Sequence, residues 1–203
     1  MSNVTTAKMV KELRDQTGAP FIDCKNALSD SEGNFDKALE ILKIKGVAKA
    51  SKKIGRDTPE GLITSYVHAG GKIGVMLEIN CETDFVARNE EFQKLSKEIA
   101  MQIAASNPLY LSRENVPEDL LLKEKEIIKA QVEETGKKKD GIADKIIESK
   151  LNKFFEESCL LEQTYIRDPK TRINDLIQNT IAKVGENIVV RRFTRYQLGE
   201  NVC

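Results

Sequence analysis

The sequence is poor in the residues from which catalytic and metal sites are most often built. Among 203 residues it has no tryptophan, one histidine and four cysteines. No pair of histidines can hold a metal, so the sequence predicts no metal centre. Catalysis of the Ser-His-Asp or Cys-His type would depend wholly on His68, which falls in a predicted turn and is expected to be exposed.

The four cysteines lie far apart, with no Cys-x-x-Cys pair. The sequence therefore predicts neither a zinc knuckle nor a disulfide framework. Cys24 and Cys81 fall on apolar faces and are expected to be buried as small hydrophobic residues. Cys203, the last residue, is either an exposed thiol or part of an inert tail.

Long hydrophobic runs are also missing. The first ten residues have no apolar core of a signal peptide, and no stretch approaches the ~18 apolar residues needed to cross a bilayer. We therefore expect no membrane association and a cytoplasmic location, or an organelle matrix if a transit peptide has been removed.

Net charge is absent as well, because 32 Lys and Arg balance 32 Asp and Glu. The chain as a whole has no general attraction to nucleic acid or to acidic membranes, so any basic surface must be local. With 40% hydrophobic and 32% charged residues, the composition is that of an ordinary globular protein. The length allows one sizeable core or two small ones.

Apolar residues at helical spacing predict three short helices in the first fifty residues. Gly18 and Pro20 are expected to end the first helix, Gly33 the second, and Asn34 is a good N-cap for the third. A core of this size is small, which is typical of a docking module rather than a catalytic domain. The three stripes are Ala7, Val10, Leu13 and Thr17; Cys24, Ala27 and Leu28; and Phe35, Ala38, Leu39 and Leu42.

Residues 49–61 are basic and polar and predict a linker. Their charges either touch RNA or are simply solvated, as such runs usually are. The composition changes here, so we expect a boundary near residue 55, with a three-helix module in 1–55 and a core in 56–203.

The remaining chain mixes strands and helices without regular β-α alternation, which predicts an α+β core. Period-two patterns predict a hairpin of strands 62–67 and 73–81, and a later strand 188–196. Helical stripes predict a helix from about Asn89 to before Pro108, an antiparallel helical pair over 118–134 and 142–157, and a last helix over 171–184.

The sequence has no phosphate-binding loop of the Gly-x-x-x-x-Gly-Lys-Ser/Thr type. Gly70-Gly71-Lys72 lies in the predicted hairpin turn, is followed by Ile73 and lacks the first glycine at the required spacing. We therefore expect that the chain does not bind GTP by itself. Since the sequence has no catalytic or metal-binding constellation either, we also expect that it needs no cofactor and is not an enzyme.

The segment 82–86 fits neither the strand pattern before it nor the helical stripe after it. Thr83 is a plausible N-cap for a short turn that carries Asp84 and Phe85. Phe85 is either presented outward at this strand-to-helix corner or folded back to plug the end of the core. Periodicity alone favours the plug.

Two long motifs resemble the signatures of the elongation factor Ts family. One is Glu78-Ile79-Asn80-Cys81-Glu82-Thr83-Asp84-Phe85-Val86-Ala87-Arg88, and the other runs from Leu13-Arg14-Asp15-Gln16-Thr17-Gly18 to Ala27-Leu28. A third similarity runs from Leu161-Glu162-Gln163 through Gly185-Glu186-Asn187-Ile188 to Arg191-Arg192-Phe193, so the resemblance covers essentially the whole chain.

The resemblance implies a ubiquitin-associated-like (UBA-like) three-helix module, an α+β core with a helical hairpin, and a function in guanine-nucleotide exchange. Family members bind elongation factor Tu in its GDP-bound and nucleotide-free states and promote replacement of GDP by GTP. The Thr-Asp-Phe-Val segment enters the partner beside its Mg²⁺ site. By this resemblance Asp84 and Phe85 are the intruding pair, Thr83 and Val86 hold the turn, and the plug interpretation of Phe85 is set aside.

The resemblance also implies a second contact and an oligomeric state. The loop of the amino-terminal module, with Gly18, Pro20, Phe21 and Ile22, would touch the same partner, with Arg14 and Lys25 as neighbours. Because a second copy of the core module is missing, the chain resembles the short form of the family, whose cores pair. We therefore expect a homodimer, with exchange and dimerisation in residues 56–203.

Two functions of other classes remain as alternatives. An RNA-binding module would use the basic residues Lys137, Lys138, Lys139, Arg191, Arg192 and Arg195, although few aromatics lie beside them for stacking. A small hydrolase would need His68. Direct nucleic-acid binding is not expected.

Overall fold

The computed structural model describes residues 6–134 and 142–200, which form two compact units. One unit contains the described residues up to Leu62 together with Ile79–Leu95 and Asp175–Val189. The other contains Ile63–Glu78, the described part of Ser96–Asn174 and the described residues from Val190 onward. Helices combine with small antiparallel sheets, so the predicted α+β class is confirmed. A division into 1–55 and 56–203 stays a prediction.

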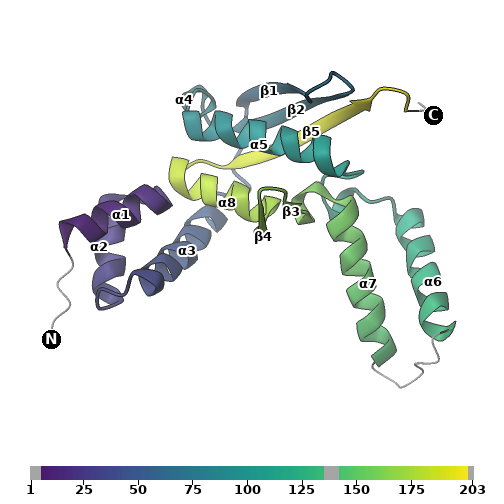
Figure 1. The fold of residues 1–203 in the computed structure, drawn as a ribbon, viewed down its shortest axis with the longest axis horizontal. Helices are drawn as coiled ribbons and strands as arrows, with labels where there is room; N and C mark the ends of the chain where they lie inside the picture. Colours follow the sequence, from purple (N-terminus) through teal and green to yellow (C-terminus); the bar gives the residue numbers. More distant parts are fainter. Residues whose placement is uncertain (1–5, 135–141, 201–203) are drawn as a thin grey trace. The chain divides into compact units, whose positions relative to one another are not determined.

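The chain begins with three helices, α1 (Ala7–Thr17), α2 (Phe21–Asp30) and α3 (Phe35–Ser51), as predicted (Figure 1). The Asn34 side chain caps α3 by accepting a hydrogen bond from the backbone N–H of Lys37 at 3.0 Å. The predicted linker is shorter than expected, since α3 continues to Ser51 with Ala50 fully buried. The shared core consists of Val10, Leu13, Cys24, Ala27, Leu28, Ala38 and Leu42.

Three strands form one sheet in the order β1 (Glu60–Val67), β2 (Ile73–Cys81) and β5 (Ile188–Gln197). A short turn joins β1 to β2, and β5 runs antiparallel to β2, because the backbone N–H of Leu198 donates to the carbonyl of Lys72 at 2.8 Å. From Val75 onward every second residue of β2 is buried, which confirms the predicted period of two: Val75, Leu77, Ile79 and Cys81.

After β2 come the four-residue helix α4 (Asp84–Ala87) and the long helix α5 (Glu90–Ser106). The side chain of Asn89 accepts from the backbone N–H of Glu91 at 2.8 Å and stabilises the start of α5. The Thr64 and Ser96 hydroxyls lie 2.7 Å apart and join β1 to α5. The buried stripe of α5 is the predicted one: Phe92, Leu95, Ile99 and Ile103.

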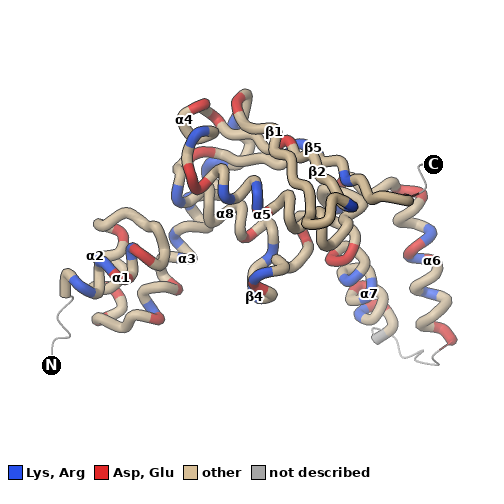
Figure 2. The backbone as a smooth tube through the Cα atoms, turned by 45° about the horizontal axis from the view of Figure 1, so that its top comes forward, with Lys and Arg blue, Asp and Glu red and all other residues tan. Residues whose placement is uncertain are grey.

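Helices α6 (Glu118–Glu134) and α7 (Ile142–Ser158) lie side by side, which confirms the predicted helical pair (Figure 1). Acidic and basic residues are interspersed along both helices (Figure 2). A small apolar core of Val116, Phe155 and Cys159 lies at the base of this hairpin. No helix among the described residues combines the length and the apolarity needed to cross a membrane.

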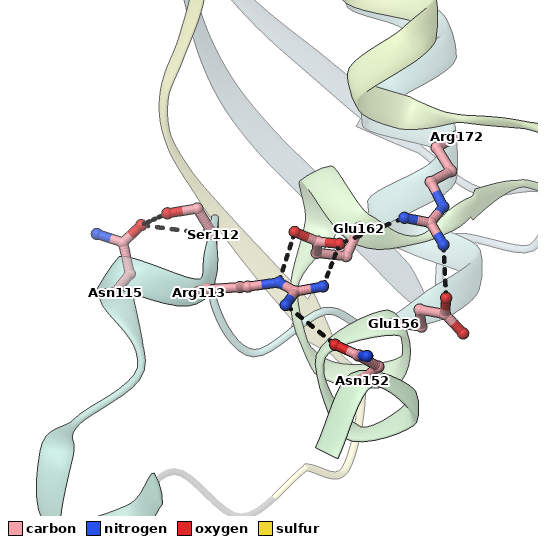
Figure 3. Close-up of polar contacts among 7 residues, drawn as sticks. All are labelled: Ser112, Arg113, Asn115, Asn152, Glu156, Glu162 and Arg172. Carbon is pink, nitrogen blue, oxygen red and sulfur yellow. Dashed lines mark hydrogen bonds and ion pairs between the residues drawn. The ribbon is translucent and has the colours of Figure 1, made fainter. Parts of the chain in front are cut away.

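One guanidinium organises the base of the hairpin. Arg113, in the 3-10 helix η1 (Arg113–Asn115), donates to both carboxylate oxygens of Glu162 at 2.8 and 3.0 Å and to the Asn152 side chain at 3.1 Å (Figure 3). Its carbon Cζ also lies 4.6 Å from the centroid of the Phe155 ring. These contacts join three segments of the second unit.

A second small sheet, of β3 (Thr164–Tyr165) and β4 (Asp168–Arg172), follows the 3-10 helix η2 (Leu160–Glu162) and precedes helix α8 (Ile173–Val184). The last helix therefore starts at Ile173 and not at about residue 171 as predicted, because Arg172 pairs with Thr164 in this sheet. The fully buried side chain of Gln102 holds the sheet, donating to the Thr164 carbonyl at 3.1 Å and accepting from the Ile166 N–H at 2.9 Å.

Candidate functional site

The segment 82–88 forms an exposed turn between β2 and α5. Thr83 has extended backbone angles, φ −132° and ψ 157°, and the chain then turns into α4. Successive helical residues point about 100° apart, so Phe85 faces solvent while Val86 and Ala87 face inward. Phe85 is 85% exposed, whereas Val86 is 9% exposed and Ala87 6%. The interpretation of Phe85 as a plug of the core is therefore wrong.

Thr83 occupies the N-cap position of α4, as predicted, but its hydroxyl makes no capping hydrogen bond. The hydroxyl donates instead to Oε1 of Glu186 at 2.7 Å, and the backbone N–H of Thr83 donates to Oε2 of the same carboxylate at 3.0 Å. The Thr83 carbonyl accepts from the Cys81 thiol at 3.1 Å. Thr83 is thus held through its backbone and its side chain.

Neighbouring contacts hold the base of the turn. Oε1 of Glu82 accepts from the backbone N–H of Asn187 at 2.7 Å, and the side chain of Asn187 donates to the carbonyl of Arg56 at 2.9 Å. Asn187 is only 3% exposed. The Arg56 guanidinium lies 3.5 Å from Oε2 of Glu82, a partly exposed ion pair that adds little. The turn is thus tied to the corner between α8 and β5.

The acid of the predicted intruding pair is already engaged. Oδ2 of Asp84 accepts from the Arg88 guanidinium at 2.8 Å, an exposed pair one helical turn apart. Such a pair breaks at little cost. Asp84 can therefore release Arg88 and bind a group on another protein instead. Phe85, which is 85% exposed, can be buried by a partner directly.

The thiol beside the turn is not a nucleophile at neutral pH. Burial, and next the charge of Glu186, raise the pKa of Cys81 to about 11. The thiol therefore stays protonated and serves as a hydrogen-bond donor to Thr83. The exposed groups of the turn are the apolar side chain of Phe85 and the carboxylate of Asp84, and both can bind another protein.

The second predicted group lies where α1 meets α2. Gly18 ends α1 with φ 66°, a left-handed conformation that favours glycine, and its N–H donates to the Arg14 carbonyl at 2.7 Å. Pro20 precedes α2, whose first two residues are Phe21, 53% exposed, and Ile22, 59% exposed. The side chains of Arg14 and Lys25 are exposed as well. An apolar pair with basic neighbours thus faces solvent on the three-helix module.

Among the residues that the structure describes, the other candidates from the sequence form no chemical site. His68 is exposed, with its Nδ1 3.0 Å from the hydroxyl of Tyr66. Within residues 6–134 and 142–200 no three His, Cys, Asp or Glu side chains cluster in a way that could hold a metal ion. Cys24 and Cys81 are buried, as predicted. Cys203 and the lysines 137–139 lie outside the described residues.

Glu186, Asn187 and Arg56 are the residues of this site that sequence reasoning missed. Glu186 and Asn187 stand in the third family similarity, but no local pattern indicates their role, because their partners are more than a hundred positions away. Because they follow Gly185 at the end of a predicted helix, they look like ordinary residues of a helix terminus.

Comparisons with known proteins agree on one family. A family model described as Elongation factor TS matches residues 40–200. The chain is 58% identical over 195 residues to the elongation factor Ts of Thermodesulfovibrio yellowstonii, covering 96% of each chain. It is 55% identical over 197 residues to that of Caldanaerobacter subterraneus subsp. tengcongensis, covering 97% of this chain and 98% of the relative. For Fervidobacterium nodosum the identity is 57% over 195 residues, covering 96% and 98%.

Proposed function

The chain belongs to the elongation factor Ts family, and from this premise we propose that it binds elongation factor Tu carrying GDP and promotes release of GDP and its replacement by GTP. It remains bound to the nucleotide-free partner until a new nucleotide enters. Its working segment is Thr83–Val86, which inserts near the Mg²⁺ site of the partner.

One observation carries the proposal, namely the exposure of Phe85 on an anchored turn. An 85% exposed phenylalanine leaves unused most of the roughly 1.5–3 kcal/mol that burial of such a side chain yields. The contacts of Thr83 and Glu82 fix the turn beneath it. A rigid apolar projection of this kind suits insertion between side chains of a partner, since little entropy is lost on binding.

The exchange follows from coupling between two ligands of the partner. The factor weakens GDP only by as much as GDP weakens the factor, and each tenfold is about 1.4 kcal/mol. Burial of Phe85 alone can therefore weaken GDP binding by only about ten- to a hundredfold. A larger acceleration requires further contacts that favour a conformation in which elongation factor Tu holds Mg²⁺ and phosphate poorly.

The three-helix module supplies some of those contacts. Phe21 and Ile22 would dock on the G domain of the partner, with Gly18 and Pro20 shaping the loop and Arg14 and Lys25 at its edge. Aromatic and aliphatic side chains that are exposed together are typical of a protein interface. We also propose that the three-helix module has a UBA-like fold.

The chain acts in the cytoplasm as a homodimer that binds two partner molecules, uses no cofactor and is not itself an enzyme. The described site fits this role, because its one thiol is buried and protonated and His68 is an exposed turn residue.

An RNA-binding role is the weaker alternative. Arg192 pairs with Glu78 at 2.7 Å, and the side chain of Arg195 is only 9% exposed and donates to the carbonyl of Ala104 at 3.3 Å. Arg195 is thus engaged within the protein, whereas Arg192 keeps a 79% exposed side chain despite its pair. RNA binding would require an affinity for RNA that falls steeply with salt.

The test is release of fluorescent GDP from purified elongation factor Tu, with this protein at catalytic amounts. We expect acceleration, and a loss of roughly ten- to a hundredfold in Phe85→Ala with binding retained. The matched control is Leu122→Ala, which removes another exposed apolar side chain, 54% exposed, on α6. No acceleration by the unmodified chain would contradict the proposed function.

A further inference from the structure

Helix α4 is too short to hold its own geometry. It has four residues, Asp84–Ala87, and its N-cap residue makes no side-chain capping bond. An isolated helical turn is unstable, because the first hydrogen bond costs the ordering of several residues. The position of Phe85 must therefore be set by contacts outside the turn.

One of these contacts joins the turn to a residue 103 positions later in the chain. Glu186 accepts from the Thr83 hydroxyl at 2.7 Å with one carboxylate oxygen and from the Thr83 N–H at 3.0 Å with the other. Hydrogen bonds to an ionised carboxylate are stronger than neutral ones. The pair fixes both the backbone direction and the side-chain rotamer at the start of the turn.

Glu186 is itself held on both sides. Gly185, with φ 79°, ends α8, and its N–H donates to the Ile181 carbonyl at 2.8 Å. On the other side Asn187 is 3% exposed, with its N–H bonded to Glu82 and its side chain to the Arg56 carbonyl. The carboxylate is thus presented to Thr83 from a fixed piece of backbone.

We propose that Glu186 is a positioning residue for exchange, whose carboxylate clamps Thr83 and so keeps Phe85 projecting in the free protein. This inference rests on the proposed function. Without the clamp, Thr83 bonds to water and the turn opens. Phe85 must then be ordered when the partner binds, and this ordering costs conformational entropy and weakens binding. Glu186 acts through Phe85 and does not itself touch the nucleotide.

The chemistry of the clamp predicts a graded response to substitution. Glu186→Ala removes both acceptors. Glu186→Gln keeps one oxygen for the Thr83 N–H, and its amide group can donate to the Thr83 hydroxyl, which can accept as well as donate. Because the charge is lost, Glu186→Gln should recover part of the function. Thr83→Val removes only the hydroxyl, whereas Thr83→Ser keeps it.

The first experiment measures GDP release from elongation factor Tu by the full-length variants. We expect kcat/KM to fall roughly tenfold in Glu186→Ala and about threefold in Thr83→Val. The loss in Glu186→Gln should be smaller than in Glu186→Ala, and the loss in Thr83→Ser smaller than in Thr83→Val. Glu157→Ala, which removes an exposed carboxylate of α7, is the matched control. Wild-type activity in Glu186→Ala, while the unmodified chain is active, would overturn the inference.

The second experiment separates positioning from general stability. In a Phe85→Ala background Glu186→Ala should change exchange by less than about twofold, because Glu186 acts through Phe85. An unchanged tenfold effect in that background would also overturn the inference. If Glu186→Ala does not fold, the same comparison is made with Thr83→Val.

A third measurement needs no partner. By NMR, hydrogen exchange at the amides of Thr83, Ala87 and Arg88, which donate to Glu186, to the Thr83 carbonyl and to the Asp84 carbonyl, should be at least about fivefold faster in Glu186→Ala than in the unmodified chain. Unchanged amide exchange would show that the clamp does not hold the turn. If the unmodified chain fails to release GDP, the proposed function fails, while this measurement still reports on the clamp.

Discussion

Arg113 and Glu162, 49 residues apart, form a bidentate ion pair. The guanidinium Nε and Nη2 donate to the two carboxylate oxygens at 2.8 and 3.0 Å. The Arg113 side chain is 38% exposed and that of Glu162 22% exposed. Glu162 also lies 3.7 Å from Arg172, which donates to Glu156 at 2.7 Å, so the pair belongs to a chain of charges at the base of the helical hairpin (Figure 3).

We expect Arg113→Ala to lower the free energy of unfolding by about 1–3 kcal/mol, because it leaves the partly buried Glu162 carboxylate with fewer donors. Arg113→Lys should recover only part of this loss, since an ammonium cannot donate in parallel to both oxygens. Urea denaturation measures the effect. The control is Lys153→Ala, which breaks an exposed pair with Glu157 at 3.8 Å and should cost less than about 0.5 kcal/mol.

Phe85 in the turn and Phe92 in α5 should respond differently to truncation. Phe85 is 85% exposed and Phe92 is fully buried. Phe85→Ala should leave the free energy of unfolding within about 0.5 kcal/mol of the unmodified chain, because it removes no internal contact of consequence. Phe92→Ala should cost about 3–5 kcal/mol. A large loss of stability in Phe85→Ala would contradict the presentation of this side chain to a partner.

Local patterns predicted most of the elements, because helices and strands bury residues at fixed periods. The buried positions of β2 and the stripe of α5 could be identified in this way. Short elements give no period, and for this reason β3, two residues long, was missed and α8 was started too early.

Long-range polar contacts lay beyond prediction for a different reason. The Thr83–Glu186 and Gln102–Gln163 hydrogen bonds join positions 103 and 61 residues apart. In a sequence with many charged residues, nothing identifies the distant hydrogen-bond partner of a single glutamate or glutamine. The exposed face of the candidate site followed from the sequence only through the family resemblance, whereas periodicity alone placed Phe85 in the core.

Gly61 should be the least replaceable glycine of the sheet. It lies in β1 with φ 152°, and a Cβ atom there would overlap the backbone of Ile79 and Asn80 in the adjacent strand. We expect Gly61→Ala to cost about 1–3 kcal/mol or more, because backbone rather than a flexible side chain must move. Gly74→Ala in β2 is the control, since a Cβ there meets no atom within 4 Å. Equal melting temperatures for the two variants would disprove this close approach.

Alkaline pH should destabilise the protein through its buried thiols. Burial raises the pKa of Cys81 and of Cys159 from 9.0 to about 11. Below pH 9 both thiols are protonated in the folded and the unfolded chain, so their contribution to stability is fully present. As pH rises from 9 towards 11 the unfolded chain releases these protons first, and stability falls by about 2–3 kcal/mol for each thiol.

Urea denaturation between pH 8 and 10.5 measures this loss. Replacing both residues, as in Cys81→Ala with Cys159→Ala, should lower the stability at pH 8 because the core loses volume, but it should make the dependence on pH above 9 clearly shallower. The slope, and not the absolute stability, is the diagnostic quantity. The same slope in the unmodified chain and the double variant would mean that other groups, such as Tyr165, whose pKa is raised to about 12 mainly by burial, govern the alkaline transition.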